Sequence, residues 1–353
     1  MKIYQLYYCA VVFLLCIVIS SFTQENDAIY NGFQQFLGTV RSYEYEQING
    51  GLSNNMQYLC MVNGKKYIVR MLNEPLPIRQ SEVLIHLLAA SKNIAPTIHY
   101  YDTNGYTMVI MDCIDGNTLL LEQACRRDVL GIIAHNVRAI AQFDATLVVD
   151  PNKKDLFAET VCRFEKIKNQ CGEILDSMIA QALCNLESVN QVIESAQRPL
   201  VMNHHDLHPR NIFFTDNDIM IIDWERAAVN YELYDLAIYS VYSCLDEQDD
   251  YYLLTEYSQR SPSDSDIYYF MCLKLMMRVH IALDFFTCTP HIPECIFDEP
   301  IKEFKYYETI FAQDTNANSP EFLYAIGISL LQEFCSEYKK FENDMAKMIY
   351  LFC

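Results

Sequence analysis

The most informative part of the sequence is HHDLHPRN at residues 204–211, followed by IIDWE at residues 221–225. It places Asp206, Asn211 and Asp223 five and then twelve residues apart. Phosphoryl transfer needs groups of this kind. One carboxylate orients a hydroxyl and accepts its proton, and two further oxygen ligands hold Mg²⁺ on the nucleotide phosphates. The spacing therefore indicates a phosphotransferase site.

The residues between these groups predict a short hairpin. The apolar runs at 212–214 and 219–222 read as two buried strands, and residues 215–218 read as the turn that joins them. Such a hairpin would hold the flanking polar side chains at one end. Aspartate and asparagine are also common in ordinary turns, so either half of the pattern alone would be weak.

Residues 203–211 and 222–225 resemble the catalytic and metal-binding loops of the aminoglycoside phosphotransferase and choline kinase superfamily, which is related to the protein kinases. Matched position by position, the resemblance implies that Asp206 is the catalytic aspartate and that Asn211 is a Mg²⁺ ligand. It also implies that Asp223 is the principal Mg²⁺ ligand. ATP and Mg²⁺ are the cofactors that follow from this resemblance.

The resemblance runs from about residue 48 to residue 237, where the segment YDLA also matches. Asp235 in that segment is expected to be structural and to tie down the catalytic loop. The implied fold is α+β and bilobal, like a protein kinase, with a small N-terminal antiparallel-sheet lobe and a larger, mainly helical C-terminal lobe. We expect three parts: an apolar leader at 1–24, a nucleotide-binding lobe at 25–115, and a catalytic and substrate-binding lobe at 116–353.

Residues 45–71 predict a strand, a loop, a second strand, an Asn-Gly hairpin and a third strand. In the loop, a Gly-Gly pair precedes Ser53 and Asn54, and this resembles the phosphate-binding loop of choline kinases. Backbone N–H groups and short polar side chains there could lie over phosphates. An ordinary tight turn is the alternative. We expect Ser53 and Asn54 to bind the nucleotide.

Arg70 lies on the third of these strands, where kinase-like folds hold a cation against the nucleotide phosphates. Residues 81–90 have the spacing of an amphipathic helix with Ser81 as its cap. Glu82 near its start is expected to pair with Arg70, so both residues are assigned to cofactor binding. The alternatives are an exposed strand arginine and a solvated glutamate in the first helical turn, where the helix dipole favours it.

The chain of 353 residues is long enough for two lobes with a large core. Its 46 acidic and 26 basic residues give a net charge of −20. This charge argues against nucleic acid or an anionic membrane surface as the main partner. It does not exclude ATP, because a phosphate site needs only local cations, amide groups and Mg²⁺.

The N-terminal run at residues 7–22 is apolar, and Lys2 precedes it. It is consistent with a signal peptide or with attachment to a membrane, and a start codon chosen too far upstream is a third reading. The 14 cysteines form no C-x-x-C pair and no zinc-binding pattern, which favours reduced thiols in a compartment such as the cytoplasm. The location of the protein stays open.

An Asn-Tyr pair ahead of YDLA resembles choline kinases, in which a tyrosine here lines the substrate pocket. We therefore expect Tyr231, together with Glu225, to contact the acceptor, because aromatic faces attract quaternary ammonium groups. Two features depart from choline kinases. Arg226 stands where they usually carry tyrosine, and Trp224 is the only tryptophan in the chain.

The function implied is ATP- and Mg²⁺-dependent phosphorylation of the hydroxyl of a small molecule, with choline or ethanolamine as the first expectation. One alternative is another small alcohol, such as an aminoglycoside, thiamine or a sugar. A second is a non-catalytic, nucleotide-binding pseudokinase or interaction module. The presence of Asp206, Asn211 and Asp223 favours an enzyme whose partners are ATP and a small alcohol rather than nucleic acid.

Overall fold

The computed structural model describes residues 26–48, 55–148, 155–168, 173–215, 218–289, 301–313 and 319–352. The chain divides into two compact units, Met1–Ile114 and Asp115–Cys353. The expected leader at 1–24, including the apolar run at 7–22, lies outside the described residues, and so do Ser53 and Asn54 of the expected phosphate loop.

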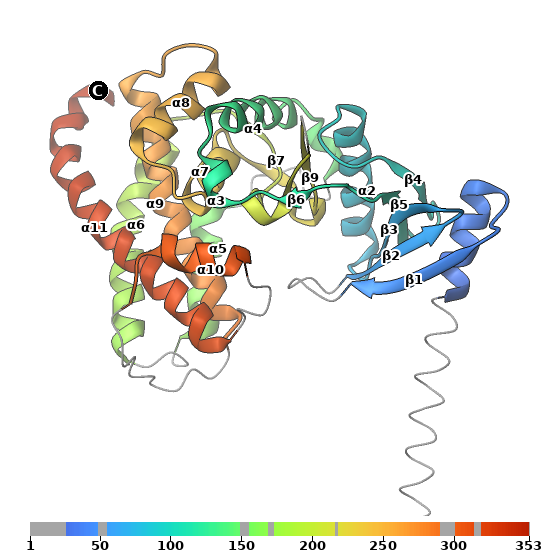
Figure 1. Ribbon diagram of the computed structural model, residues 1–353. Coiled ribbons are helices and arrows are strands. Elements are labelled where there is room, and N and C mark those ends of the chain that lie inside the picture. Colours follow the sequence, from blue (N-terminus) through green and yellow to red (C-terminus); the bar gives the residue numbers. More distant parts are fainter. Residues whose placement is uncertain are drawn as a thin grey trace, which may run out of the picture. The chain divides into compact units, whose positions relative to one another are not determined.

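The first unit contains a five-stranded antiparallel sheet in the order β1-β2-β3-β5-β4 (Figure 1). A helix at residues 26–37 packs against this sheet through Ile29 and Phe33, which join its core. The remaining elements of the unit are β1 Tyr43–Ile48, β2 Met56–Val62, β3 Lys65–Met71, α2 Leu76–Ser91, β4 Ile98–Tyr101 and β5 Met108–Asp112.

The sheet follows from alternation in the sequence. Along β2, Tyr58, Cys60 and Val62 are buried while the residues between them are partly exposed, as expected of a strand with one face on a core. The expected Asn-Gly hairpin then reverses the chain. Asn63 and Gly64 both have positive φ, 51° and 81°, which a type I′ turn requires.

The second unit is mainly helical (Figure 1). Its helices are α3 Leu121–Ala124, α4 Arg127–Ile140, α5 Leu156–Ile167, α6 Glu173–Ser195, α7 Tyr234–Tyr242, α8 Glu247–Ser258, α9 Asp264–Thr287, α10 Phe304–Gln313 and α11 Pro320–Phe352. Its short strands are β6 Asn117–Thr118, β7 Leu200–Asn203, β8 Ile212–Phe214, β9 Ile219–Ile221 and β10 Ala228–Tyr231.

Helix α9 is the centre of the second unit. It packs against α5, α6, α7 and α11. Ser263 and Asp266 form a capping box that satisfies backbone groups at its N-terminus. Most of the helix is buried, so its few polar side chains, including His280, are held in fixed positions.

The predicted hairpin is present, with Ile212 opposite Ile221 across β8 and β9. Strand β6 extends it to three strands, and β7 pairs separately with β10. The expected α+β, protein-kinase-like architecture is confirmed, with an antiparallel sheet in the first unit and a helical second unit. Within the described ranges, no helix has both the length and the apolar character needed to cross a bilayer.

Candidate active site

The loop between β7 and β8 carries Asp206 and Asn211. Asp235, in the first turn of α7, is fully buried and fixes the start of this loop. Its carboxylate accepts the backbone N–H of His204 at 2.6 Å and that of His205 at 2.9 Å. The expected structural role of Asp235 is therefore confirmed by its contacts.

Asn211 is joined directly to Asp206. Its amide Nδ2 donates to the backbone carbonyl of Asp206 at 3.0 Å and to the carboxylate oxygen Oδ2 at 3.2 Å. These contacts use the donor end of the amide, so the carbonyl oxygen Oδ1 of Asn211 is the atom that could ligate a cation.

Asp223 follows β9, and its backbone is in the left-handed region at φ 67°, ψ 66°. A non-glycine residue is uncommon there, although aspartate and asparagine tolerate it best, and such backbone strain is often found at functional sites. Two bonds connect this loop to the first. The N–H of Ile222 donates to the carbonyl of Asn211 at 2.9 Å, and His204 Nε2 lies 2.9 Å from the carbonyl of Ile222.

Nearby cations keep Asp206 ionised. Burial alone would raise its pKa, but the surrounding positive charge outweighs that effect and holds the pKa below its usual value. Arg226 Nη1 and His208 Nε2 each lie 3.8 Å from Asp206 Oδ1. Burial lowers the pKa of His208 to about 4, so its ring is neutral near pH 7, and Arg226 and Arg210 are the permanent cations that lower the pKa of Asp206. Asp206 can therefore accept a proton.

A contact from far along the chain steadies the same loop. Arg210 Nη1 lies 2.7 Å from Oε2 of Glu308 on α10, and that glutamate side chain is 2% exposed. The guanidinium also lies over the rings of Phe311 and Tyr242, at 4.3 and 5.5 Å from their centroids. Nothing in the sequence pattern pointed to Glu308, which is 98 residues from Arg210.

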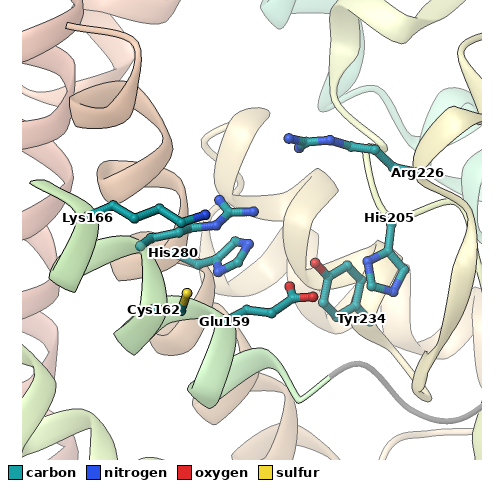
Figure 2. Close-up of a pocket in the computed structure, with 8 residues that line it drawn as sticks. Glu159, Cys162, Lys166, His205, Arg226, Tyr234 and His280 are labelled. Atoms are coloured by element: carbon teal, nitrogen blue, oxygen red, sulfur yellow. The ribbon is translucent and has the colours of Figure 1, made fainter. Parts of the chain in front are cut away.

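A cavity of about 330 Å³ lies beside this loop (Figure 2). Helix α5, the loop of Asp206, the turn at Trp224–Arg226, α7 and α9 all contribute to its wall. Three of its lining side chains are permanent cations and one is a carboxylate. The lining residues are Glu159, Cys162, Arg163, Lys166, His205, Arg226, Tyr234 and His280.

The residues expected to contact the acceptor are not among those that line this cavity. Tyr231 is buried on β10, and its hydroxyl donates to Glu194 on α6. Glu225 is half-buried on the turn beside the cavity, and its neighbour Arg226 lines the cavity instead. The role of both in substrate binding stays a prediction that their positions do not support. Arg163 and Lys166 lie three residues apart on α5, and this spacing, which is visible in the sequence, places the two side chains on one face of the helix.

In the first unit, the predicted pair of Arg70 and Glu82 is present. Arg70 Nη1 lies 3.0 Å from Glu82 Oε1, and the two side chains are 7% and 4% exposed. The alternatives, an exposed arginine and a solvated first-turn glutamate, are wrong. Helix α2 begins at Leu76 rather than Ser81, with a proline in its first turn, so Glu82 lies deeper in the helix and is buried.

Asn211 and Asp223 fit a Mg²⁺ site of the kind that shares its ligands with a nucleotide. Mg²⁺ is usually held by one or two carboxylates while substrate phosphates supply further oxygens. The part of the chain that the structure describes holds no group of three or more His, Cys, Asp or Glu side chains that could hold a metal ion.

The sequence matches the model of the phosphotransferase enzyme family over residues 44–261. No curated protein sequence matches the chain closely enough to count as a relative. Among solved structures, Plasmodium vivax ethanolamine kinase shares 17% identity at a TM-score of 0.60, covering 84% of this chain and 83% of its own. Choline kinase from Cryptosporidium parvum shares 18% identity at a TM-score of 0.60, and the match covers 86% of this chain and 91% of that kinase.

An aminoglycoside 2′-phosphotransferase variant is similar to a comparable degree, with 15% identity, a TM-score of 0.57, and coverage of 88% of this chain and 97% of its own. At such identities these likenesses establish the fold. The family match covers most of the chain, and it includes every residue of the two connected loops. The chain therefore belongs to the phosphotransferase enzyme family and has the protein-kinase-like fold.

Proposed function

We propose that the protein transfers the γ-phosphoryl group of ATP to the hydroxyl of a small molecule, in a reaction that depends on Mg²⁺. One observation carries this proposal. The Asp206 carboxylate is bonded to Asn211, and the loop of both is joined by two hydrogen bonds to Ile222, the neighbour of Asp223. A cavity of about 330 Å³, lined by His205 and Arg226 rather than by these three residues, lies next to the loop. This geometry supports Asp206 as the proton acceptor and Asn211 and Asp223 as the proposed metal ligands.

Each residue has a distinct role in this proposal. Asp206 orients the acceptor hydroxyl in line with the phosphoryl group and accepts its proton late in the transfer. Asn211 and Asp223 would hold Mg²⁺, which neutralises charge on the nucleotide phosphates when it is bound. Arg226, 3.8 Å from Asp206, keeps the carboxylate in its basic form.

Nucleotide use is supported by relatives of the same fold, one of which was solved with AMP and another with GDP. Which nucleoside triphosphate this chain uses is part of the proposal, and ATP is the choice that the sequence resemblance favours. Arg70, held by Glu82 in the first unit, is the proposed contact for the nucleotide phosphates.

Choline and ethanolamine were the acceptors that the sequence favoured, and the cavity gives them little support. A pocket for a quaternary ammonium needs aromatic faces and carboxylates. The wall of this cavity has one tyrosine and one glutamate, against two arginines and a lysine. We therefore propose a small alcohol as the acceptor without restricting it to these two amines.

Substrate-dependent release of ADP from purified protein tests this function. We expect a hydroxylated small molecule to stimulate ADP release, and we expect EDTA to abolish that stimulation because Asn211 and Asp223 then hold no metal. ADP release that no alcohol stimulates, or that continues unchanged in EDTA, would contradict the proposal.

The role of Arg70 is tested by separating phosphate binding from folding. Arg70→Met should raise the KM for ATP by roughly 10-fold or more, since a charged hydrogen bond contributes about 1.5–3 kcal/mol. Binding of adenosine, which lacks phosphates, should change little. Because this variant leaves Glu82 buried without its cation, the free energy of unfolding should also fall, by about 3–5 kcal/mol.

The matched control is the double variant Arg70→Met/Glu82→Leu, which leaves no unpaired buried charge. It should regain much of the lost stability in thermal unfolding without regaining affinity for ATP. If the double variant binds ATP as the wild type does, Arg70 acts only through the fold.

A further inference from the structure

The loop that carries Asp206 and Asn211 is held at its start by Asp235, and a residue from far along the chain lies against its end. We propose that this residue, Glu308 on α10, is a positioning residue for phosphoryl transfer, which holds the end of the loop through Arg210 in the geometry that the reaction needs. This inference rests on the proposed function, because the loop carries the proposed base and a proposed metal ligand.

Arg210 belongs to the turn that joins the two functional groups of the loop. The N–H of His208 donates to the carbonyl of Asp206 at 2.9 Å, and the N–H of Asn211 donates to the carbonyl of His208 at 2.9 Å. Arg210 lies inside the second of these turns, directly before Asn211. Because Asn211 also bonds the Asp206 carboxylate, a displacement of Arg210 would reach both groups.

The polar contacts of Glu308 go to this loop. Its Oε2 accepts a hydrogen bond from Arg210 Nη1 at 2.7 Å, and its Oε1 is buried without a hydrogen-bond partner in the described part of the chain. Burial raises the pKa of Glu308, and the charge of Arg210 opposes that rise. A buried carboxylate is costly to keep, so its bond to the catalytic loop is the reason that the structure offers for its presence.

Stability is a weak explanation for such a pair. The Glu308 side chain is 2% exposed and that of Arg210 is 23% exposed. Replacement of a buried ion pair by apolar residues of similar volume is often neutral or stabilising, whereas removal of one partner alone is destabilising. The pair therefore favours a role in fixing the position of the loop over a role in strengthening the fold.

Aromatic rings fix the direction of the Arg210 guanidinium as well. It lies 4.3 Å from the ring centroid of Phe311 on α10 and 5.5 Å from that of Tyr242 on α7, and such cation–π contacts add to the ion pair. Tyr242 also lies edge-on to His208, with ring centroids 5.3 Å apart. The end of the loop therefore packs against the same ring that holds the arginine.

One face of α10 supplies the contacts to Arg210, and the helix is itself held by α11. Glu308 and Phe311 are three residues apart, which places them on the same side of the helix. Phe311 also stacks on Phe322 of α11, with centroids 6.2 Å apart. At the start of α10, the N–H of Phe304 donates to Glu333 of α11 at 3.1 Å. Helix α10 can therefore act as a fixed support for the loop.

Replacement of Glu308 by leucine is expected to lower kcat by about 10- to 100-fold, because small displacements of reacting groups have effects of that size. The KM for ATP should change little, because Glu308 is not a proposed nucleotide contact. Glu308→Gln keeps an oxygen that can accept the bond from Arg210, so it should retain more activity than the leucine variant. The assay follows Mg²⁺-dependent ADP release with whichever of choline, ethanolamine, glycerol and glucose stimulates it most.

Two further variants separate position from stability. The double variant Arg210→Met/Glu308→Leu leaves no charge of the pair without its partner, so it should be more stable than Glu308→Leu in thermal unfolding while its kcat stays low. A double variant with the kcat of the wild type would overturn the proposal. Glu303→Gln is the matched control for Glu308→Gln, at an exposed glutamate directly before α10, and it should have wild-type kinetics.

Hydrogen exchange tests the position of the loop without any acceptor. The amides of His208 and Asn211, at the end of the loop, should exchange faster in Glu308→Leu than in the wild type. Those of His204 and His205, which are held at the start of the loop, should keep their wild-type rates. An equal rise at all four amides would mean a general loss of stability and would overturn the proposal.

The two measurements separate this inference from the proposed function. If the wild-type protein releases no ADP with any alcohol, the kinase proposal fails, and faster exchange confined to the end of the loop still supports Glu308 as its support. If the wild type is active and the Glu308 variants keep its kcat, the kinase proposal stands and the positioning role fails, whatever the exchange rates.

Discussion

Replacement of Asp206 by asparagine is expected to lower kcat by about 10²- to 10⁴-fold, the usual contribution of a general base, while affinity for ATP changes little. Asparagine keeps the shape of the side chain but has no charge to accept the proton of the acceptor hydroxyl. The loop should keep its structure, because Asn211 also bonds the backbone carbonyl of residue 206 and Asp235 accepts the backbone N–H of His204. Steady-state kinetics with the best acceptor measure the change.

The matched control is Asp115→Asn, the same substitution at an exposed aspartate of the same unit. It should have the kinetics of the wild type. Thermal unfolding and ATP binding of Asp206→Asn decide whether Asp206 has a catalytic or a structural role. If stability and ATP binding fall together, Asp206 is a structural carboxylate, and if turnover stays near that of the wild type, it has no catalytic role.

Replacement of Asp223 by asparagine should lower Mg²⁺-dependent turnover by roughly 100-fold or more, because the metal loses its charged protein ligand and with it several kcal/mol of transition-state stabilisation. Asparagine is the informative substitution here. The backbone at residue 223 is left-handed, φ 67°, and asparagine tolerates that conformation nearly as well as aspartate does.

Asp223→Ala is the comparison that separates metal binding from backbone strain. Alanine in the left-handed region costs on the order of 1–2 kcal/mol, so this variant should be less stable than Asp223→Asn in thermal unfolding while both lose activity. Asn211→Ala should lose less Mg²⁺-dependent activity than either Asp223 variant, since a neutral ligand contributes less charge. The dependence of rate on Mg²⁺ concentration is the readout, and an Asp223→Asn protein with unchanged Mg²⁺ dependence would remove this residue from the metal site.

Short-range features of the site could be predicted from the sequence. The apolar runs beside Asn211 and Asp223 predicted the hairpin, because strand and turn preferences act over a few residues. The ties from Asp235 to the loop and from Arg70 to Glu82 followed from motifs whose geometry is shared across the fold.

Features of the site that depend on contacts between distant parts of the chain could not be predicted from the sequence. The partner of Arg210 is Glu308 on α10, and no local pattern links positions so far apart in the chain. Tyr231 was expected to face a substrate, but burial on β10 directs its hydroxyl to Glu194. Side-chain direction depends on tertiary packing, which a motif does not encode.

The cavity wall shows the same limit. Arg226 was visible in the sequence as a departure from choline kinases, but its place in the cavity wall follows only from its packing beside residues of α5 and α9. Arg163 and Asp284 are 121 residues apart, and only the packing of their two helices brings them together. The charge of a cavity is therefore a property of the fold, although each residue that creates it stands in the sequence.

Phosphorus NMR of the complete reaction measures the proposed chemistry most directly. With Mg²⁺, ATP and the best acceptor, the wild-type protein should convert the γ-phosphate signal of ATP into that of a phosphomonoester on the acceptor. The Asp206→Asn protein should form almost none in the same time. Release of inorganic phosphate without a phosphomonoester, or equal rates of product formation by the two proteins, would contradict a kinase that uses Asp206.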